Sequence, residues 1–404
     1  MKTVGIIAEY NPFHNGHLLQ IREIRRRFPD ARIVVVMSGS FTQRGSAAIL
    51  DKWTRAASAV RHGVSLVLEL PTVFATRSAQ YFAGGGVRLL DRLGVAETLA
   101  FGSEYDDLSL LSQMAKESDA SENTGALRAA LCNGESYAAA LTGNSDPSAV
   151  IRQPNVILAV EYLRALTRYA AKLTPLPLPR FAAAHNDRAL PSDEAIPIAS
   201  ASAIRAALFK PETHENAFRF VPTDVAALLP DNPADTARLL RPILARLLTA
   251  PLDELSSVAG MSEGLEHRLH RAALAARSYE ELSASVRSKR YPQTRVSRLL
   301  FHLLLGLSKK TARRLDEAGP LYVRPLAFDE KGREILRAVE NKAMLPIVTK
   351  PARFLSKIKS SSLEHEMLSL DIRATALASL AADPVGSPAA NADFLISPVY
   401  LPTQ

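Results

Sequence analysis

Residues 4–17 read Val-Gly-Ile-Ile-Ala-Glu-Tyr-Asn-Pro-Phe-His-Asn-Gly-His, an apolar run that ends in two histidines three positions apart. Apolar residues then recur at helical spacing as far as Phe28, so the stretch predicts a strand that turns into a helix. Residues three apart share one face of a helix, and the first turn of a helix attracts anions through its unpaired N–H groups. The stretch therefore predicts a phosphate site around His14 and His17.

The alternative for this histidine pair is a surface or packing role, which is the commoner fate of an isolated pair on a helix. The surroundings favour a nucleotide site, because a strand precedes the pair and Gly16 lies within it. Gly16 lacks a side chain and would let a bulky ligand approach the backbone, while Pro12 stiffens the approach.

Length and composition indicate a large globular protein. At 404 residues the chain exceeds one ordinary hydrophobic core, so two or three domains are expected. The only cysteine, Cys132, excludes an intramolecular disulfide, and no cysteine cluster suggests a metal site, so no metal ligands are predicted. No apolar run reaches membrane-spanning length and no signal segment precedes the first strand. We therefore expect a cytoplasmic protein that does not contact membranes.

The chain is basic, and its basic residues are concentrated in one segment. The formal net charge is +8 and the isoelectric point is near 9.6, which suggests a polyanionic partner. Residues 287–315 contain lysines and arginines but no acidic residue, and a tyrosine ring there could stack on an unpaired base. The alternative is a basic helix that serves solubility alone. The expected RNA contacts are Lys289, Arg290, Tyr291, Arg295, Arg298, Lys309 and Lys310.

Short apolar runs and helical patterns alternate over the first hundred residues. The runs cover residues 4–8, 33–37, 65–70 and 99–101, with helical patterns at 17–28, 51–62 and 78–93. Such runs are typical of parallel strands buried on both faces, so we expect an α/β protein with a Rossmann-like, doubly wound parallel sheet. Ligands of such sheets bind at the carboxyl ends of the strands, where the loops 9–15, 38–45 and 102–105 would converge.

Neither common phosphate loop is present, since there is no Gly-x-Gly-x-x-Gly after the first strand and no Gly-x-x-x-x-Gly-Lys. Residues 84–86 are three glycines, which are more typical of close packing than of phosphate binding. A second candidate motif lies at residues 198–205, where Ser200 or Ser202 would cap a helix and Arg205 would lie in its first turns. The alternative there is a plain serine cap.

Three parts are expected along the chain. Residues 1–215 would form the sheet domain, with a helical insertion at 105–150. Residues 216–380 are dominated by helical patterns and would form a mainly helical domain that binds the polyanion. Residues 381–404 begin with a segment rich in Ala, Pro, Asp and Asn, so a flexible tail is expected.

The two candidate motifs together resemble the nucleotidyltransferase superfamily that includes the class I aminoacyl-tRNA synthetases. The resemblance implies that the histidines and the later serine and arginine hold the triphosphate of ATP while a nucleophile attacks its α-phosphorus. Negative charge then accumulates on the phosphoryl oxygens and on the departing diphosphate, so fixed donors and cations lower the barrier. A carboxylate nucleophile arrives ionised, so neither histidine has to act as a base.

Further segments narrow the resemblance to one family. These segments are Glu9–His17, Ser38–Gly45, Asp51–Arg55, Glu69–Pro71, Phe101–Glu104, Pro154–Asn155, His185–Asp187 and Ile198–Arg205. In this order they resemble the bacterial tRNA(Met) cytidine acetate ligase family, and the resemblance covers nearly the whole chain.

The resemblance implies an ATP-dependent ligase. Acetate and ATP, with Mg²⁺, would form acetyl-adenylate, and the acetyl group would pass to N4 of the wobble cytidine of elongator tRNA(Met), giving N4-acetylcytidine. The implied catalytic residues are His14, His17, Ser202 and Arg205. The implied ATP contacts are Ile7, Ala8, Glu9, Tyr10, Asn11, Pro12, Phe13, His14, Asn15, Gly16, His17, Leu18, Leu19, Gln20, Gly102, Asn155, Arg180 and Ser200. The family pattern has two asparagines where this chain has Asn155 and Val156, so which position contacts the nucleotide stays open.

Other charged residues of these segments allow two interpretations each. Lys52 and Arg55 are one helical turn apart and could reach phosphate or lie on a solvated helix face. Glu104 could orient a metal or a ribose, or be an ordinary loop residue. Gln43 and Arg44 could cover the nucleotide, or belong to a mobile surface loop.

Two other function classes compete with the ligase. A small-metabolite adenylyltransferase would use the same nucleotide fold, with the helical half merely structural. The acid-free basic stretch disfavours it, because a small substrate needs no such area. A non-catalytic RNA-binding protein with an inherited nucleotide fold is the other alternative, and the presence of both phosphate motifs argues against it.

Overall fold

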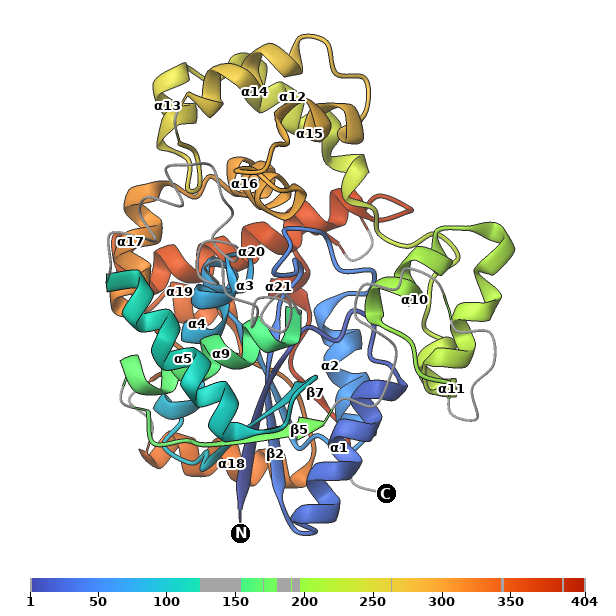
Figure 1. Cartoon of the computed structure of the whole chain (residues 1–404), viewed down its shortest axis with the longest axis vertical. Helices are drawn as coiled ribbons and strands as arrows, with labels where there is room; N and C mark the ends of the chain where they lie inside the picture. Colours follow the sequence, from blue (N-terminus) through green and yellow to red (C-terminus); the bar gives the residue numbers. More distant parts are fainter. Residues whose placement is uncertain are drawn as a thin grey trace.

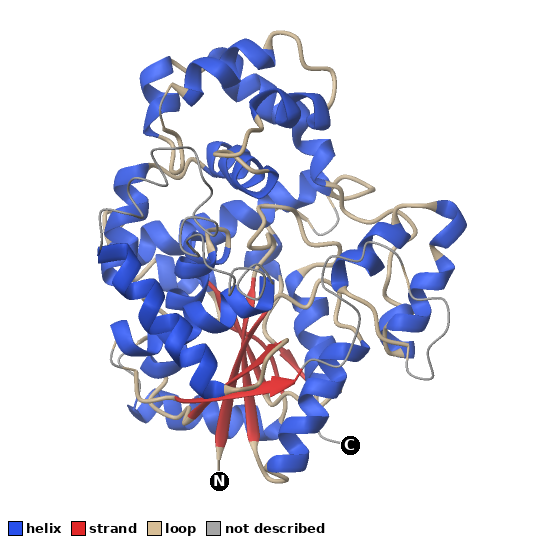
Figure 2. Cartoon of the chain, in the orientation of Figure 1, coloured by secondary structure: helices blue, strands red, loops and turns tan. Residues whose placement is uncertain are grey.

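The computed structural model describes residues 2–123, 154–169, 171–179, 190, 197–262, 264–342, 345–386 and 389–402. Its strands are β1 (Thr3–Ala8), β2 (Arg32–Ser38), β3 (Leu66–Leu70), β4 (Thr98–Ser103), β5 (Thr174–Pro179), β6 (Pro325–Phe328) and β7 (Val399–Tyr400). They form a single seven-stranded sheet in the order β5-β4-β1-β2-β3-β6-β7. Figure 2 shows this sheet surrounded by helices.

Helices make up most of the remaining described chain. Over the first half they are α1 (Asn15–Arg27), α2 (Lys52–Arg61), α3 (Thr72–Ala75), α4 (Ala79–Arg92), α5 (Leu108–Asn123), α9 (Pro154–Arg168) and α10 (Ala201–Leu208). Those that follow are α11 (Thr223–Ala226), α12 (Leu240–Thr249), α13 (Leu252–Ser257), α14 (Leu265–Ala273), α15 (Tyr279–Val286), α16 (Gln293–Leu305), α17 (Lys309–Ala318), α18 (Glu330–Lys342), α19 (Pro351–Leu355), α20 (Leu363–Ala381) and α21 (Ala392–Leu395). Short 3-10 turns lie at 211–213, 215–220 and 236–239.

The sheet confirms the predicted doubly wound fold. β1 pairs in parallel with β2 on one side and with β4 on the other, so the strand order reverses beside β1. β3 and β5 extend the parallel sheet outward from β2 and β4. The carboxyl ends of β1 and β4 therefore flank the switch point, which is where doubly wound sheets bind their ligands. β5 contains three prolines, yet the register with β4 is maintained across all six of its residues.

Alternation along the strands supplies a core on each face of the sheet. Val4 and Ile6 of β1 pack with α1 and α2 on one face, while Ile7 packs with α4 and α9 on the other. Both faces are covered, which explains why these strands are apolar at nearly every position.

The glycine triplet of α4 is a packing point, as its sequence context indicated. A Cβ atom at Gly85 would lie 2.5 Å from Phe74, and one at Gly86 would lie 2.6 Å from the Ile7 side chain. These distances are shorter than real Cβ contacts, so the glycines let α4 lie close against α3 and β1.

The expected division of the chain at residue 215 does not coincide with the sheet. β6 pairs antiparallel to β3, and β7 pairs with β6, so segments after residue 320 complete the sheet. One continuous apolar core also runs from α4 and α9 into α12, α14 and α16. Figure 1 shows α12 to α15 gathered at the end of the molecule opposite the chain termini. This helical region rests on the sheet half through buried side chains.

Two expectations about the second half were wrong in detail. The helical pattern expected for residues 216–380 is interrupted between α11 and the turn at 236–239, because Pro230 and Pro233 cannot continue a helix. The segment 381–404 was expected to be a flexible tail, but 399–400 form β7 and Asp393 is fully buried. A buried carboxylate with cationic partners fixes this segment, and composition alone could not indicate those partners.

Candidate active site

A cavity of about 570 Å³ opens at the carboxyl ends of β1 and β4. The predicted site residues that line it are Ile7, Ala8, Glu9, Tyr10, Asn11, His14, Gly16, His17, Leu19, Gln20, Gly102, Asn155, Ser200, Ser202 and Arg205. Loop residues Gln43 and Arg44 also line it, so the loops after β1, β2 and β4 converge as expected. Arg180 and the segment 185–187 lie outside the described residues.

Four residues expected to contact ATP do not line this cavity. Phe13 is buried in the core and stacks on His62, and Pro12 is buried beside it. Asn15 donates from its side-chain amide to the backbone oxygens of Pro197 and Arg219. Leu18 packs against the core on the α1 side of the sheet. These residues hold the shape of the histidine segment and do not face the cavity.

The two histidines form the cap of α1. His14 is the residue before the helix, and its Nδ1 accepts a hydrogen bond of 3.1 Å from the Gly16 N–H. The Nδ1 atom of His17 accepts in turn from the His14 N–H at 3.2 Å, and the two rings stack with centroids 3.6 Å apart. Because Nδ1 accepts in both rings, the neutral rings carry their proton on Nε2 and are donors there. Donors at a helix N-terminus suit phosphate oxygens.

Gly16 has a different role from the one its sequence context suggested. A Cβ atom at this position would lie 3.0 Å from Cε1 of His14 and 3.1 Å from its Nδ1. Gly16 therefore makes room for the His14 ring as well as lining the cavity.

α10 supplies the opposite side of the phosphate site. Ser200 caps this helix by accepting from the Ala203 N–H at 3.0 Å, which decides between the two serines that the sequence left open. Arg205 donates to the backbone oxygen of Asn11 at 2.6 Å and to Oγ of Ser202 at 3.2 Å. Burial lowers the pKa of Arg205, and the nearby Glu9 carboxylate partly restores it. Arg205 thus joins the segment after β1 to α10 while its charge faces the cavity.

Asn155 lines the cavity from the start of α9, beside Gly102 of β4. Its Nδ2 donates to Oε1 of Glu104 at 2.5 Å, whereas Val156 is buried in the core. Because a carboxylate only accepts, this bond orients the amide so that its oxygen is the remaining acceptor. Asn155 is therefore the position that faces the cavity, and Glu104 is the residue that orients it.

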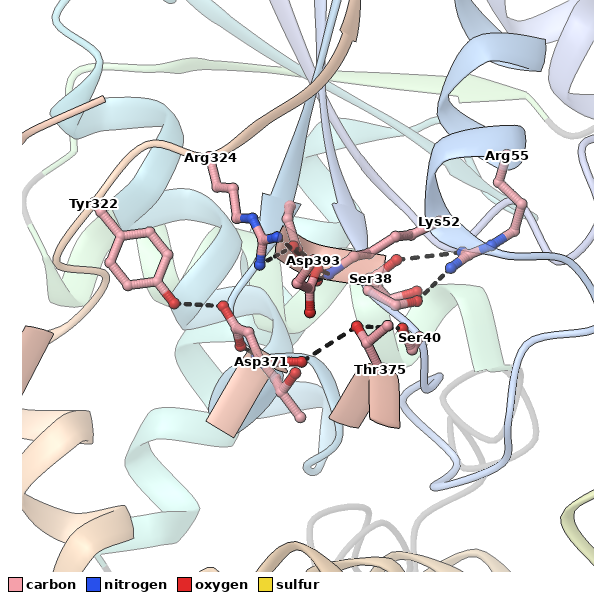
Figure 3. A network of polar contacts seen from close by, with 12 residues as sticks. Ser38, Ser40, Lys52, Arg55, Tyr322, Arg324, Asp371, Thr375 and Asp393 are labelled. Atoms are coloured by element: carbon pink, nitrogen blue, oxygen red, sulfur yellow. Dashed lines mark hydrogen bonds and ion pairs between the residues drawn. The ribbon is translucent and has the colours of Figure 1, made fainter. Parts of the chain in front are cut away.

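Lys52 and Arg55 lie neither on a solvated face nor in the cavity. The Lys52 side chain is 0% exposed and its Nζ lies 2.8 Å from Glu69 and 2.7 Å from Asp393. Arg55 is also fully buried and donates to the backbone oxygens of Glu9, Ser38 and Gly39. Figure 3 shows both side chains within a polar network that also contains Arg324, Asp371 and Asp393. Helical spacing could not predict this, because every partner except Glu9 and Asp393 lies on β2, β3 or the loop after β2.

The predicted RNA-binding segment divides in the folded chain. Arg290, Arg295 and Arg298 line the same cavity as the histidines. Lys289, Lys309 and Lys310 are exposed on the outer surface. Tyr291 is 7% exposed, with the Arg295 guanidinium 4.6 Å from its ring centre, so the expectation that it stacks on an unpaired base was wrong.

The loop after β2 joins these arginines to the sheet. Gly45 has φ +76°, and a Cβ atom there would lie 2.7 Å from the backbone of Arg298. Only glycine fits such a close approach in the left-handed region. The loop thereby packs against α16, and sequence reasoning missed that α16 forms a cavity wall because no local pattern indicates this contact.

An apolar wall completes the cavity, and sequence reasoning missed it as well. It is formed by side chains of α4, β4 and α9, of which only Phe101 lies in a segment that carried the family resemblance. Its residues are Ala79, Phe82, Phe101, Ile157, Leu158 and Tyr162. Nucleobases and acyl groups are the parts of the expected substrates that such a surface would accept.

Two further features were looked for in the described part of the chain, a metal-ligand cluster and a membrane-spanning helix. Among the described residues, no group of three or more His, Cys, Asp or Glu side chains is placed to hold a metal ion. In the same part of the chain, no helix is long and apolar enough to cross a membrane.

Comparison with known proteins agrees with this geometry. The model of the HIGH Nucleotidyl Transferase family matches residues 1–392. The tRNA(Met) cytidine acetate ligase of Syntrophomonas wolfei is 37% identical, with 99% of each chain covered. That of Syntrophotalea carbinolica is 38% identical over 93% of each chain. Two crystal structures of Thermotoga maritima TmcAL, each 32% identical and fully covered, superpose with TM-scores of 0.90 for the apo form and 0.87 for the form bound with alpha-thio ATP.

The doubly wound sheet, the paired histidines at the first helix and the serine–arginine helix facing them define a nucleotidyl transferase. Sequence identity above 30% to tRNA(Met) cytidine acetate ligases, over almost the whole chain, specifies one family within this class. The chain belongs to the tRNA(Met) cytidine acetate ligase family.

Proposed function

We propose that this protein uses ATP to activate acetate as acetyl-adenylate and transfers the acetyl group to N4 of the wobble cytidine of elongator tRNA(Met). The observation that carries the proposal is a single cavity lined by the α1 histidines, by Arg205 and by the arginines of residues 290–298. Donors for a triphosphate and cations for a polynucleotide face the same space. The names of the relatives include tRNA(Met), cytidine and acetate, and the similar Thermotoga maritima protein was crystallised with alpha-thio ATP. The elongator tRNA and the wobble position come from the family resemblance.

In the first step, an acetate oxygen would attack the α-phosphorus of ATP and diphosphate would leave. The Nε2 donors of His14 and His17, the α1 N-terminus and Arg205 would stabilise the charge that accumulates on the phosphoryl oxygens. The donor set suits an anion, since donors and cations outnumber the two carboxylates, Glu9 and Glu23, among the described residues of the cavity. We propose that Mg²⁺ enters bound to ATP and is held mainly by phosphate oxygens and water, as is common for this ion.

The proposal is tested by the source of the acyl group. Purified protein and tRNA would be given ATP with either acetate or acetyl-coenzyme A, and N4-acetylcytidine would be followed by mass spectrometry. We expect product only with acetate and ATP, together with AMP and diphosphate, because the cytosine amine is conjugated with its ring and needs an activated acyl donor. Product from acetyl-coenzyme A without ATP would exclude the adenylate route.

For tRNA, we propose that the exposed lysines of α17 bind backbone phosphates while the arginines of the cavity receive the reacting nucleotide. Replacing both Lys309 and Lys310 by alanine should reduce the slope of log affinity against log salt by about 0.7 to 0.9 for each phosphate that the variant no longer neutralises. Arg337→Ala is the control, because Arg337 is exposed on α18, which lies near the chain termini and apart from α17 (Figure 1). Filter binding at several salt concentrations measures the slopes. An unchanged slope in the double lysine variant would show that Lys309 and Lys310 of α17 do not contact tRNA phosphates.

A small-metabolite adenylyltransferase is the second candidate function. The arginines at the cavity disfavour it, because a small nucleophile would not require Arg290, Arg295 and Arg298 in the cavity wall together with exposed lysines in the same segment of the chain. If the tRNA ligase function holds, the protein works in the cytoplasm, where tRNA is modified.

A further inference from the structure

Two carboxylates are found among the described residues that line the cavity, and they differ in availability. Both oxygens of Glu23 accept from arginine, with Arg26 and Arg27 donating at 2.7 to 2.8 Å. Those hydrogen bonds lower the pKa of Glu23 to about 2. Glu23 is therefore occupied and weakly basic, which leaves Glu9 as the carboxylate that can act on a substrate.

Glu9 is held in the site by hydrogen bonds to its backbone and to its side chain. It follows the last residue of β1, and its backbone oxygen accepts from the Arg55 guanidinium at 2.6 Å. Its Oε1 atom accepts from the Gln43 N–H at 2.6 Å. It is near enough to Arg205 and to Tyr162 to change the pKa of each. Glu9 thus lies between Arg205 and the apolar wall that contains Tyr162. No described residue donates to its Oε2 atom, which is left as an acceptor in the cavity.

A fixed negative charge at this place opposes the first step, in which two anions must meet. Coulomb repulsion between a carboxylate and a triphosphate or an acetate is unfavourable, and the more so in a partly desolvated site. The charge therefore indicates a role in the second step, when an uncharged amine enters the cavity.

The second step needs a base, and the other cavity groups do not supply one. The Nδ1 atoms of His14 and His17 already accept backbone N–H groups, so their Nε2 atoms are protonated donors. Burial raises the pKa of the Tyr10 and Tyr162 hydroxyls, which keeps both neutral. The remaining charged residues among the described cavity lining are arginines, which stay protonated.

We propose that Glu9 is the general base of acetyl transfer and the residue that receives the N4 amino group of the target cytidine, an inference that rests on the proposed function. N4 attacks the carbonyl carbon of acetyl-adenylate, the new C–N bond forms, and the bond from that carbon to the phosphate oxygen breaks. AMP leaves with the electron pair, and the N4 proton passes to Oε2 of Glu9 and then to solvent.

The same geometry supplies base recognition. In nucleic-acid complexes, a glutamate oxygen accepts from the N4 amino group of cytosine, whereas uracil has an acceptor at that position. Glu9 would therefore select cytidine by the hydrogen bond that also aligns the amine for proton transfer.

The two steps can be separated experimentally with hydroxylamine, a strong nucleophile that captures acetyl-adenylate as acetohydroxamate without a protein base. Full-length protein would be given ATP and labelled acetate with either tRNA or hydroxylamine, and both product rates measured. Glu9→Gln keeps an oxygen that can accept from the Gln43 N–H but removes the charge. We expect it to lower the ratio of N4-acetylcytidine to acetohydroxamate formation about 10² to 10⁴-fold, the usual range for a general base.

Controls distinguish this role from others. Glu9→Asp should restore part of the ratio, because it returns a carboxylate one methylene shorter. Arg205→Ala should lower both rates together, since it acts on the shared adenylate. A Glu9→Gln ratio equal to that of the wild type, or a loss of acetohydroxamate as large as the loss of N4-acetylcytidine, would overturn the proposal. Failure of the proposed function itself would be seen separately, as wild-type protein that forms neither product.

Discussion

Replacing His17 by alanine should lower the rate of acetyl-adenylate formation about a hundredfold to a thousandfold, the effect of losing one donor to developing charge. The reason is that His17 lines the cavity and its Nδ1 accepts from the His14 N–H, so the neutral ring carries its proton on Nε2 and can donate to a phosphate oxygen. Acetate-dependent exchange of labelled diphosphate into ATP measures this step without tRNA. Near-normal exchange in the variant would show that His17 does not stabilise the phosphoryl charge.

The His14 position requires a separate control, because His14 also caps α1. Alanine there would lose the cap and with it about 0.5 to 2 kcal/mol of stability. His14→Asn keeps a side-chain acceptor for the helix and removes the imidazole donor. We expect this variant to unfold at nearly the wild-type denaturant concentration and still to lose exchange activity as His17→Ala does. Retained activity in His14→Asn would mean that His14 serves only the helix.

The second large effect concerns stability. Lys52→Met should lower the free energy of unfolding by about 3 to 5 kcal/mol, as expected when one partner of a buried ion pair is removed. Glu69 and Asp393 would keep Arg324 as their shared cation, at 3.0 and 2.6 Å, but would lose Lys52. Burial alone would raise the pKa of Asp393, and Lys52 and Arg324 together hold it at about 2. Urea unfolding followed by circular dichroism measures the loss.

Two companion variants make this prediction specific. Arg61→Met lies on the same helix but is exposed, so it should change the free energy of unfolding by less than about 0.5 kcal/mol. The double variant Lys52→Met/Asp393→Asn removes one charge of each sign. Its loss of free energy of unfolding should be smaller than the sum of the losses of the two single variants. Strict additivity would show that the two charges do not interact, contrary to their 2.7 Å separation.

The loop after β2 connects the buried polar network around Lys52 and Arg55 to the active site. Ser40 contacts Thr375 of α20 at 3.1 Å, and Arg55 donates both to the backbone oxygen of Glu9, which lines the cavity, and to that of Gly39 in the loop after β2. Figure 3 shows the contact between Ser40 and Thr375, and Arg55 reaching toward Ser38. The C-terminal helices therefore position the loop that carries Gln43, although none of their residues belongs to a recognisable motif.

The local sequence by itself determined the strands and helices that surround the nucleotide cavity, from β1 to β4 and at the start of α10. The apolar runs of β1 to β4, the glycines that end α2 and α4, and the serine before α10 all act within a few residues of themselves. Gly63 and Gly94 adopt φ of +102° and +67°, conformations that their lack of a side chain permits. The convergence of the loops followed as well, because parallel strands place their carboxyl ends at one edge of a sheet.

Only the tertiary structure decided which charged residues serve the site and which serve the fold. Lys52, Arg55 and Arg298 are all helix cations that the sequence allowed to contact phosphate, yet two are buried among carboxylates and carbonyl groups while one lines the cavity. Their surroundings come from strands and helices far apart in the chain. A charge acts on whatever lies within a few ångströms, and spacing along the sequence specifies that neighbourhood only within one element. The same reason explains the buried Tyr291, the ordered Asp393 and the availability of Glu9.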